Sequence, residues 1–249
     1  MVLGPGRVAT GIAAHVESDG RIMRRLDLSG RTGRAQPFRV EIAPQGTGRV
    51  LAGSAADTGA LLAALDVIPD MTGGRLALSG HYDDTAPGHP LTGHAEIADF
   101  RIRHAPALAK LLQAMTLYGL VDLMQGPGLG FTRLIAPFRL SDDILELHDA
   151  RAFSPSLGMT AKGRLDLARE AFDMQGTIVP AYFFNSLLGN VPLVGRLFSP
   201  ERGGGLFAAT YTLRGPLADP SVSVNPLAAL TPGFLRGVFG LLDRAATPR

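Results

Sequence analysis

The stretch Met159-Thr160-Ala161-Lys162-Gly163-Arg164-Leu165-Asp166-Leu167 decides the fold class of this chain. Its odd positions are apolar or small, and its even positions are polar. Because successive side chains of a β-strand point to opposite faces of a sheet, this period of two buries one face and leaves the other in water. The stretch therefore predicts a strand over 159–167 with one face in a core.

The same alternation recurs along most of the chain. Residues 171–178 repeat it at once, and the segment 48–80 has a strand at each end of a helical insert. Further strands are predicted at 37–43, 74–80, 94–103, 131–140, 143–151, 205–214 and 220–224, with two more within 6–29. Short turns such as Ala86-Pro87-Gly88 join them. One-sided strands joined by short turns predict a mainly β protein with an antiparallel sheet.

Helical stretches interrupt the predicted sheet. Asp57 is a suitable N-cap for a helix over 57–65, and Pro106 suits the first turn of a helix over 106–120. Residues 180–198 are predicted to form two short apolar helices. The stretch 226–242 is predicted to be an amphipathic segment that lies on a surface or caps a groove.

Composition bounds the class of protein. The chain has 249 residues, of which 46% are hydrophobic and 18% charged, which is too apolar for disorder. We expect a single domain over 1–249, with a possible joint in the turn-rich stretch 81–93. The 24 basic and 22 acidic residues form no dense basic patch, so nucleic acid is not an expected partner. There is no cysteine, which excludes disulfides and thiolate sites.

No targeting segment is evident at the start of the chain. The first residues lack the apolar core of a signal peptide, and no window reaches the roughly 18 apolar residues of a transmembrane helix. We therefore expect either a cytoplasmic protein or a Met1 that lies partway into a longer protein whose anchor is upstream.

Motifs of common catalysts are missing. The sequence has no G-x-S-x-G, no H-E-x-x-H and no phosphate-binding loop followed by lysine, so no catalytic residue, metal or cofactor is predicted. The run His81 to His89, followed by His94, holds imidazoles and carboxylates that could ligate a divalent metal, but a solvated turn explains it as well. Asp142-Asp143 with Glu146 and His148 is predicted to be a turn that enters a polar strand face.

Apolar side chains are abundant in the last third of the chain. They could cover the open face of the sheet as core, or they could face lipid or a membrane. The candidates for a membrane-facing or capping helix are Phe183, Phe184, Leu187, Leu188, Phe198, Leu230, Phe234, Leu235, Val238 and Leu241.

An ordered set of motifs at 171–242 resembles a known family. It begins with Gly176-Thr177-Ile178-Val179-Pro180-Ala181-Tyr182 and continues with Asn185-Ser186-Leu187-Leu188-Gly189-Asn190-Val191-Pro192. Gly203-Gly204-Gly205-Leu206-Phe207, Tyr211-Thr212-Leu213-Arg214-Gly215-Pro216 and Val222-Ser223-Val224-Asn225-Pro226-Leu227 follow. This set resembles the C-terminal domain of AsmA-like proteins, particularly the YhdP-type members of the AsmA/TamB-related envelope proteins.

The resemblance implies a fold and a function. It implies a long, twisted antiparallel sheet curled into an open apolar groove, with amphipathic helices at the C-terminal end. It also implies a non-enzymatic module on the periplasmic face of the envelope, membrane-anchored through a region upstream of this chain, that moves phospholipid between inner and outer membrane. The implied partners are phospholipid or another acyl lipid, a membrane surface and an envelope protein.

The groove would be lined by the apolar residues of the best alternating strands. These candidates are Phe100, Ile102, Met159, Leu165, Leu167, Phe172, Met174, Ile178, Phe207, Tyr211 and Leu213. The same residues would form a sealed core if the helices closed over them, and the chain would then be a structural or assembly module whose C-terminal helices dock a membrane or an envelope partner. A hydrolase at a membrane surface would depend on the His81–His94 cluster alone.

Overall fold

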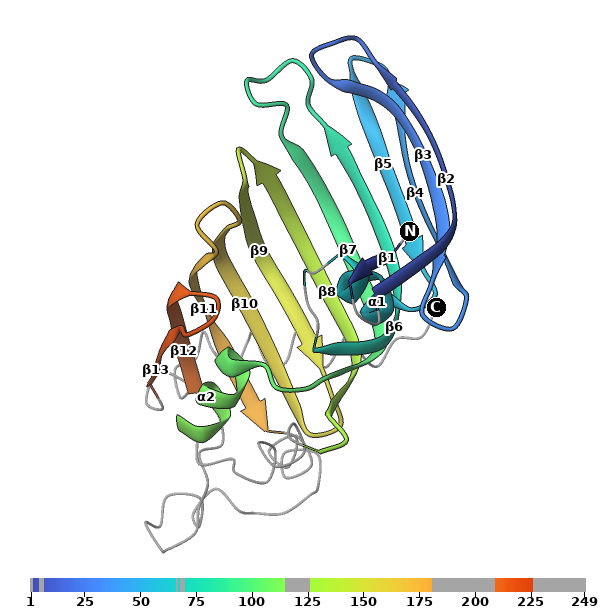
Figure 1. The fold of residues 1–249 in the computed structure, drawn as a ribbon. Coiled ribbons are helices and arrows are strands. Elements are labelled where there is room, and N and C mark those ends of the chain that lie inside the picture. Colours follow the sequence, from blue (N-terminus) through green and yellow to red (C-terminus); the bar gives the residue numbers. More distant parts are fainter. Residues whose placement is uncertain are drawn as a thin grey trace, which may run out of the picture.

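The strands follow one another in space in the same order as in the chain. In the computed structural model, which describes residues 2–4, 7–65, 67, 70–114, 126–180 and 209–225, they form one 13-stranded sheet with β1 and β13 at its edges (Figure 1). The strands are β1 (Val2–Gly4), β2 (Arg7–Ser18), β3 (Met23–Thr32), β4 (Gln36–Gln45), β5 (Gly48–Ala55), β6 (Met71–Tyr82), β7 (Leu91–Ile102), β8 (Leu129–Ser141), β9 (Ile144–Phe153), β10 (Leu157–Asp166), β11 (Ala171–Pro180), β12 (Ala209–Pro216) and β13 (Ser221–Asn225). Every pair of neighbours is antiparallel, so the predicted mainly β antiparallel fold is confirmed.

Two sequence features predicted as turns join strands of this sheet. Asp142 and Asp143 have φ angles of 48° and 62° and connect β8 to β9, where Ser141 pairs with Ile144. Two left-handed residues are what a tight hairpin turn needs, and Asp tolerates this conformation. The stretch 81–93 contains the loop between β6 and β7, whose strands remain paired up to Tyr82 and Leu91.

Helix α1 (Thr58–Ala64) follows β5 and begins as the sequence predicts. The Asp57 side chain accepts a hydrogen bond from the Ala60 N–H at 2.9 Å, which satisfies a free donor of the first turn. Thr58 is buried and donates to the Gly74 carbonyl of β6 at 2.9 Å. The helix contacts β2 and β3 as well as β6 and β7. Because β3 and β6 are not neighbours in the sheet, the sheet must curve around α1.

Helix α2 (Pro106–Ala114) follows β7 and contacts β13, far along the sheet from its own neighbours in sequence. Its Lys110 ammonium donates to Asp219 at 2.5 Å and to the Pro220 carbonyl at 2.9 Å. Both helices lie on the same side of the sheet, near one end of the strands (Figure 1). We call that side the inner face.

The positions of the helices follow from strand direction. Because neighbouring strands run in opposite directions in chain order, all odd-numbered strands end at the same end of the sheet. α1 follows β5 and α2 follows β7, and the described chain also stops at this end after β11 and β13. We call it the helix end.

Some predictions differ from the structure or lie beyond what it describes. The strand β1 was not predicted, because three residues are too few to show a period of two. The observed α2 ends at Ala114, and residues 115–120 of the predicted helix lie outside the described residues. The predicted helices at 180–198 and 226–242 also lie outside them, except for Pro180 at the end of β11. Among the described helices, neither has the length and apolarity needed to cross a membrane.

Candidate functional site

A row of apolar residues crosses the whole inner face. Directly opposite residues of neighbouring strands point to the same face, so the register of the sheet defines rows that run across the strands. One such row takes a residue from every strand from β2 to β13 and contains no polar side chain. We call it the apolar row: Val16, Leu26, Ile42, Leu51, Gly80, Gly93, Phe138, Leu147, Gly163, Met174, Leu213 and Val222.

A second row lies closer to the helix end. It runs from β3 to β12 and is also free of polar side chains: Gly30, Phe38, Ala55, Leu76, Ile97, Leu134, Ala152, Met159, Ile178 and Ala209. The two rows lie four residues apart on most strands, and the inner positions between them, such as Val40, Leu78 and Ala136, are also apolar. The inner face therefore carries an apolar band across most of the sheet.

The opposite, outer face is covered by ion pairs between neighbouring strands. Arg39 binds Asp27 at 2.8 Å, and Arg133 binds Glu96 at 2.8 Å. Further pairs of this kind are Arg164 with Glu146, and Arg214 with Asp173. Such exposed pairs add little stability, but they show that this face is in water.

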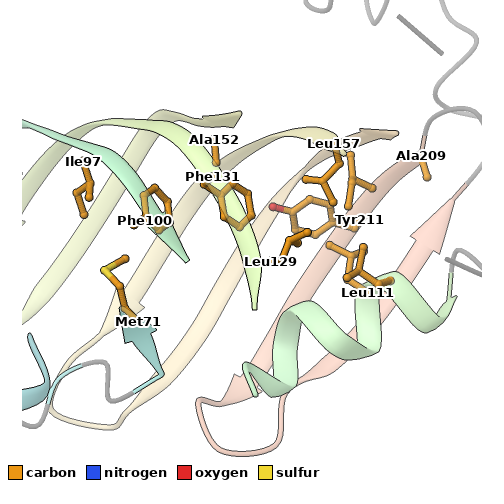
Figure 2. Packing of buried hydrophobic residues seen from close by; sticks show 12 residues of the cluster. Met71, Ile97, Phe100, Leu111, Leu129, Phe131, Ala152, Leu157, Ala209 and Tyr211 are labelled. Carbon is orange, nitrogen blue, oxygen red and sulfur yellow. The ribbon is translucent and has the colours of Figure 1, made fainter. Parts of the chain in front are cut away.

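At the helix end, the inner face is a closed core. Leu111 and Leu112 of α2 are 3% and 0% exposed, and they belong to one cluster with Leu129 and Tyr211 (Figure 2). In the same cluster, the rings of Phe100 and Phe131 stack with centroids 5.1 Å apart and an angle of 9° between their planes. Helix α2 therefore helps to bury the apolar side chains of the inner face at this end and shields them from water.

Away from the helix end, a second cluster is built from the sheet alone. It contains Ile42, Leu51, Leu91 and Phe138, with partly buried neighbours such as Leu78. Leu78 lies two residues from Leu76 of the helix-end cluster on β6, so both clusters are on the inner face. Within the described part of the chain, no helix residue belongs to this second cluster.

The structure places most predicted lining residues on the inner face, but in two different settings. Those at the helix end belong to the core cluster or pack against it: Phe100, Ile102, Met159, Ile178 and Tyr211. Those beyond α2 lie on paired inner positions: Leu165, Phe172, Met174 and Leu213. Phe207 lies outside the described residues.

Leu167 needs a correction. It was predicted on the buried side of a strand, but β10 ends at Asp166 and the Leu167 side chain is 45% exposed. Its N–H donates to the Asp143 carbonyl at 2.9 Å, which ties it to the turn between β8 and β9. The alternating sequence pattern extends one residue beyond the end of the strand, so it does not show that the chain turns after Asp166.

Tyr211 links β12 to β10 on the inner face, near the edge of the sheet formed by β13. Its ring lies across from Gly176, and its hydroxyl donates to the Thr160 carbonyl of β10 at 2.8 Å. A Cβ at Gly176 would lie 1.9 Å from that carbonyl oxygen, so the arrangement requires glycine there. Burial raises the pKa of the Tyr211 phenol, which therefore stays a neutral hydrogen-bond donor.

A buried ion pair closes the end of the inner face opposite to the helices. Arg49 of β5 is 5% exposed, and its guanidinium donates from two nitrogens to the Asp84 carboxylate at 2.7 to 3.0 Å. It also donates to the Met23 carbonyl at 2.7 Å and lies 4.1 Å from the center of the Tyr82 ring. The hydrogen bonds from Arg49 lower the pKa of Asp84, and burial raises the pKa of Tyr82.

This ion pair bears on the predicted histidine cluster. The Asp84 carboxylate forms an ion pair with Arg49, and the His89 Nδ1 atom is 3.8 Å from an Asp84 oxygen. That imidazole nitrogen is buried without a hydrogen-bond partner. Throughout the residues that the structure describes, no three His, Asp or Glu side chains are grouped so that they could hold a metal.

Sequence reasoning missed Arg49, although a signal was present. Arg49, Leu51 and Gly53 lie on the same face of β5, so the alternation places a charged residue on the apolar face of this strand. A charge in such a position is rarely buried unless it is paired. Its partner is 35 residues away in a loop, which the pattern of a single strand cannot reveal.

Comparisons with known proteins give no family for this chain. No protein-family model, no curated protein and no solved structure matches it.

Proposed function

We propose that this chain is a lipid-binding module that shields acyl chains on its inner face, as its resemblance to AsmA-like domains implies. The observation that carries the proposal is the apolar row, which crosses every strand from β2 to β13 without a polar side chain. A sheet that served only as a scaffold would need apolar residues beneath its helices, and not across its full width.

The row matches the physical demand of lipid transfer. Burying an acyl chain is worth about 0.8 kcal/mol per CH₂, so a sixteen-carbon chain that leaves a bilayer for water faces a barrier of roughly 12 kcal/mol. Strands spaced about 4.8 Å apart give the row a length of roughly 50 Å. A track of this length is short for an envelope crossing and suits one segment of a longer bridge. No reaction is proposed, and the module needs no cofactor.

The topology suggests how the module would be oriented. β11 leads into the predicted apolar helices at 180–198, and β13 leads into the predicted amphipathic segment at 226–242. Both strands end at the helix end. We propose that this end faces the membrane or an envelope partner, on the periplasmic side of the envelope. The groove would open between this end and the Arg49–Asp84 pair, where the second apolar cluster lies.

One observation favors the structural or assembly role as a second candidate. Leu111 and Leu112 of α2 belong to the same buried cluster as Phe100, Ile178 and Tyr211, so at this end the sheet is sealed core. If the whole inner face were sealed in this way, deletion of 226–242 would remove an envelope partner from pull-downs and leave the lipid content unchanged.

A photo-crosslinking series tests the lipid proposal. A photoreactive amino acid placed at Phe172 or Met174 would face the inner side, while the same group at Asp173 or Gln175 would face outward on the same strand. We expect phospholipid adducts at the first two positions and background labelling at the other two. Equal labelling at all four positions would rule out the groove.

A further inference from the structure

The two edges of the sheet differ in how they are protected. β13 has five residues, and α2 lies against it, with Lys110 bound to the adjacent Pro220 carbonyl. β2 has 12 residues, and β1 pairs with it at Arg7 and Val8. Every residue from Thr10 to Ser18 is exposed. This edge therefore offers backbone N–H and C=O groups to another strand.

The exposed edge also lacks the residues that usually protect one. From Thr10 to Ser18 there is no Lys, Arg or Pro, which are common guards against strand addition. Ile12 and Val16 are 41% and 52% exposed, and both lie on the inner face. Val16 is the first member of the apolar row, so the row ends in water at this edge.

We propose that this edge pairs with the β2 strand of a second copy of the chain. The sequence is self-complementary for antiparallel pairing about Ala14, because Ile12 of one copy then lies opposite Val16 of the other. His15 lies opposite Ala13, and Glu17 opposite Gly11, so no charge directly faces a like charge. Glu17 is also paired with Arg25 of its own copy at 3.4 Å.

The geometry of the rest of the strand permits this pairing. The two-fold axis would be perpendicular to the sheet, so both inner faces stay on one side. Val16, at the end of the apolar row of one copy, would then face Ile12 of the other copy, which lies beside Gly30 of the second row. β1 occupies the edge at Arg7 and Val8, outside the paired segment 11–17. The register shift between Thr10 and Ala13, where Gly11 has a φ of 56°, and the shift between Glu17 and Ser18 limit the regular segment to 13–17. The interface is therefore short, and the dimer forms in a concentration-dependent way. This inference does not depend on lipid binding.

Single cysteines give a register-specific test, because the chain has none of its own. In the full chain, Ala14→Cys would lie on the two-fold axis, with Cα atoms about 4.5 to 5.5 Å apart, which is within reach of a disulfide. Ala13→Cys is the matched control, since its two copies would be on the order of 8 Å apart. We expect rapid oxidative dimer formation for Ala14→Cys and at least about tenfold slower formation for Ala13→Cys. Equal rates, or no dimer with Ala14→Cys, would overturn the proposal.

A second pair of variants tests the association without cysteine. Val16→Lys should raise the dissociation constant of the dimer at least about tenfold in analytical ultracentrifugation, because it places a charge opposite Ile12 of the other copy. Leu167→Lys should leave it unchanged, since Leu167 is similarly exposed but lies away from the edge. A chain that stays monomeric at all concentrations, or a dimer that Val16→Lys does not weaken, contradicts the proposal. If the chain stays monomeric and an added peptide slows the hydrogen exchange of the β2 amides, the edge pairs with a different chain and not with a second copy.

Discussion

Arg49 is the residue on which the far end of the inner face depends, because it binds β3, its ring neighbor Tyr82 and the β6–β7 loop at once. Asp84→Asn would leave its guanidinium buried without a counter-charge. We expect a loss of about 3 kcal/mol in the free energy of unfolding, measured by urea denaturation. Asp99→Asn is the control, since the Arg75–Asp99 pair is 69% and 58% exposed and should cost less than about 1 kcal/mol.

The same pair predicts a dependence on pH. Because Arg49 lowers the pKa of Asp84 in the folded protein, the carboxylate stabilises the fold above the ordinary Asp pKa of about 4. This contribution is lost as the pH falls through the lowered pKa. The stability difference between the wild type and Asp84→Asn should therefore shrink below about pH 4. A difference that stays constant down to pH 2 would show that the pair does not control this stability.

At the scale of elements, α2 follows β7 in the chain and packs against β13 at the far edge of the sheet. Leu112 of this helix is 0% exposed, so Leu112→Ala should lower the free energy of unfolding by about 3 kcal/mol through lost burial and a cavity. Gln113 is exposed next to it, and Gln113→Ala should change stability by less than about 0.5 kcal/mol. Hydrogen exchange should also speed up in β12 and β13 with Leu112→Ala. If both variants behaved alike, α2 would not be packed on the sheet in solution.

The elements were predictable where each strand carries its own pattern. The alternation in β10 and β11, the N-cap Asp57 and the Asp142-Asp143 turn all appear in a few consecutive residues, so the sequence alone indicates them. The position at which α2 packs on the sheet was not predictable, because Leu112 and Tyr211 are far apart in sequence. That tertiary contact decides which lining candidates are buried in the core cluster, such as Tyr211, and which lie outside it, such as Leu213. The continuity of the apolar row likewise depends on register, which a list of strands does not fix.

At the scale of the whole molecule, the proposed function requires the row to be uninterrupted. Leu147→Asp would place a charge in the middle of the apolar row, and we expect the rate of phospholipid transfer between vesicles to fall about tenfold or more. His148→Asp changes the exposed neighbor on the outer face and should leave the rate unchanged. Circular dichroism would confirm that both variants are folded. Equal rates for the two variants would exclude transfer along the row.

The order of the strands has a consequence for how the chain is assembled. Each strand pairs with the one made just before it, so the sheet can grow one hairpin at a time as the polypeptide emerges, without waiting for distant partners. Every intermediate then ends in a fresh edge that the next strand covers. The contact of α2 with β13 can form only after β13 has been made, so it follows all the pairings between the described strands.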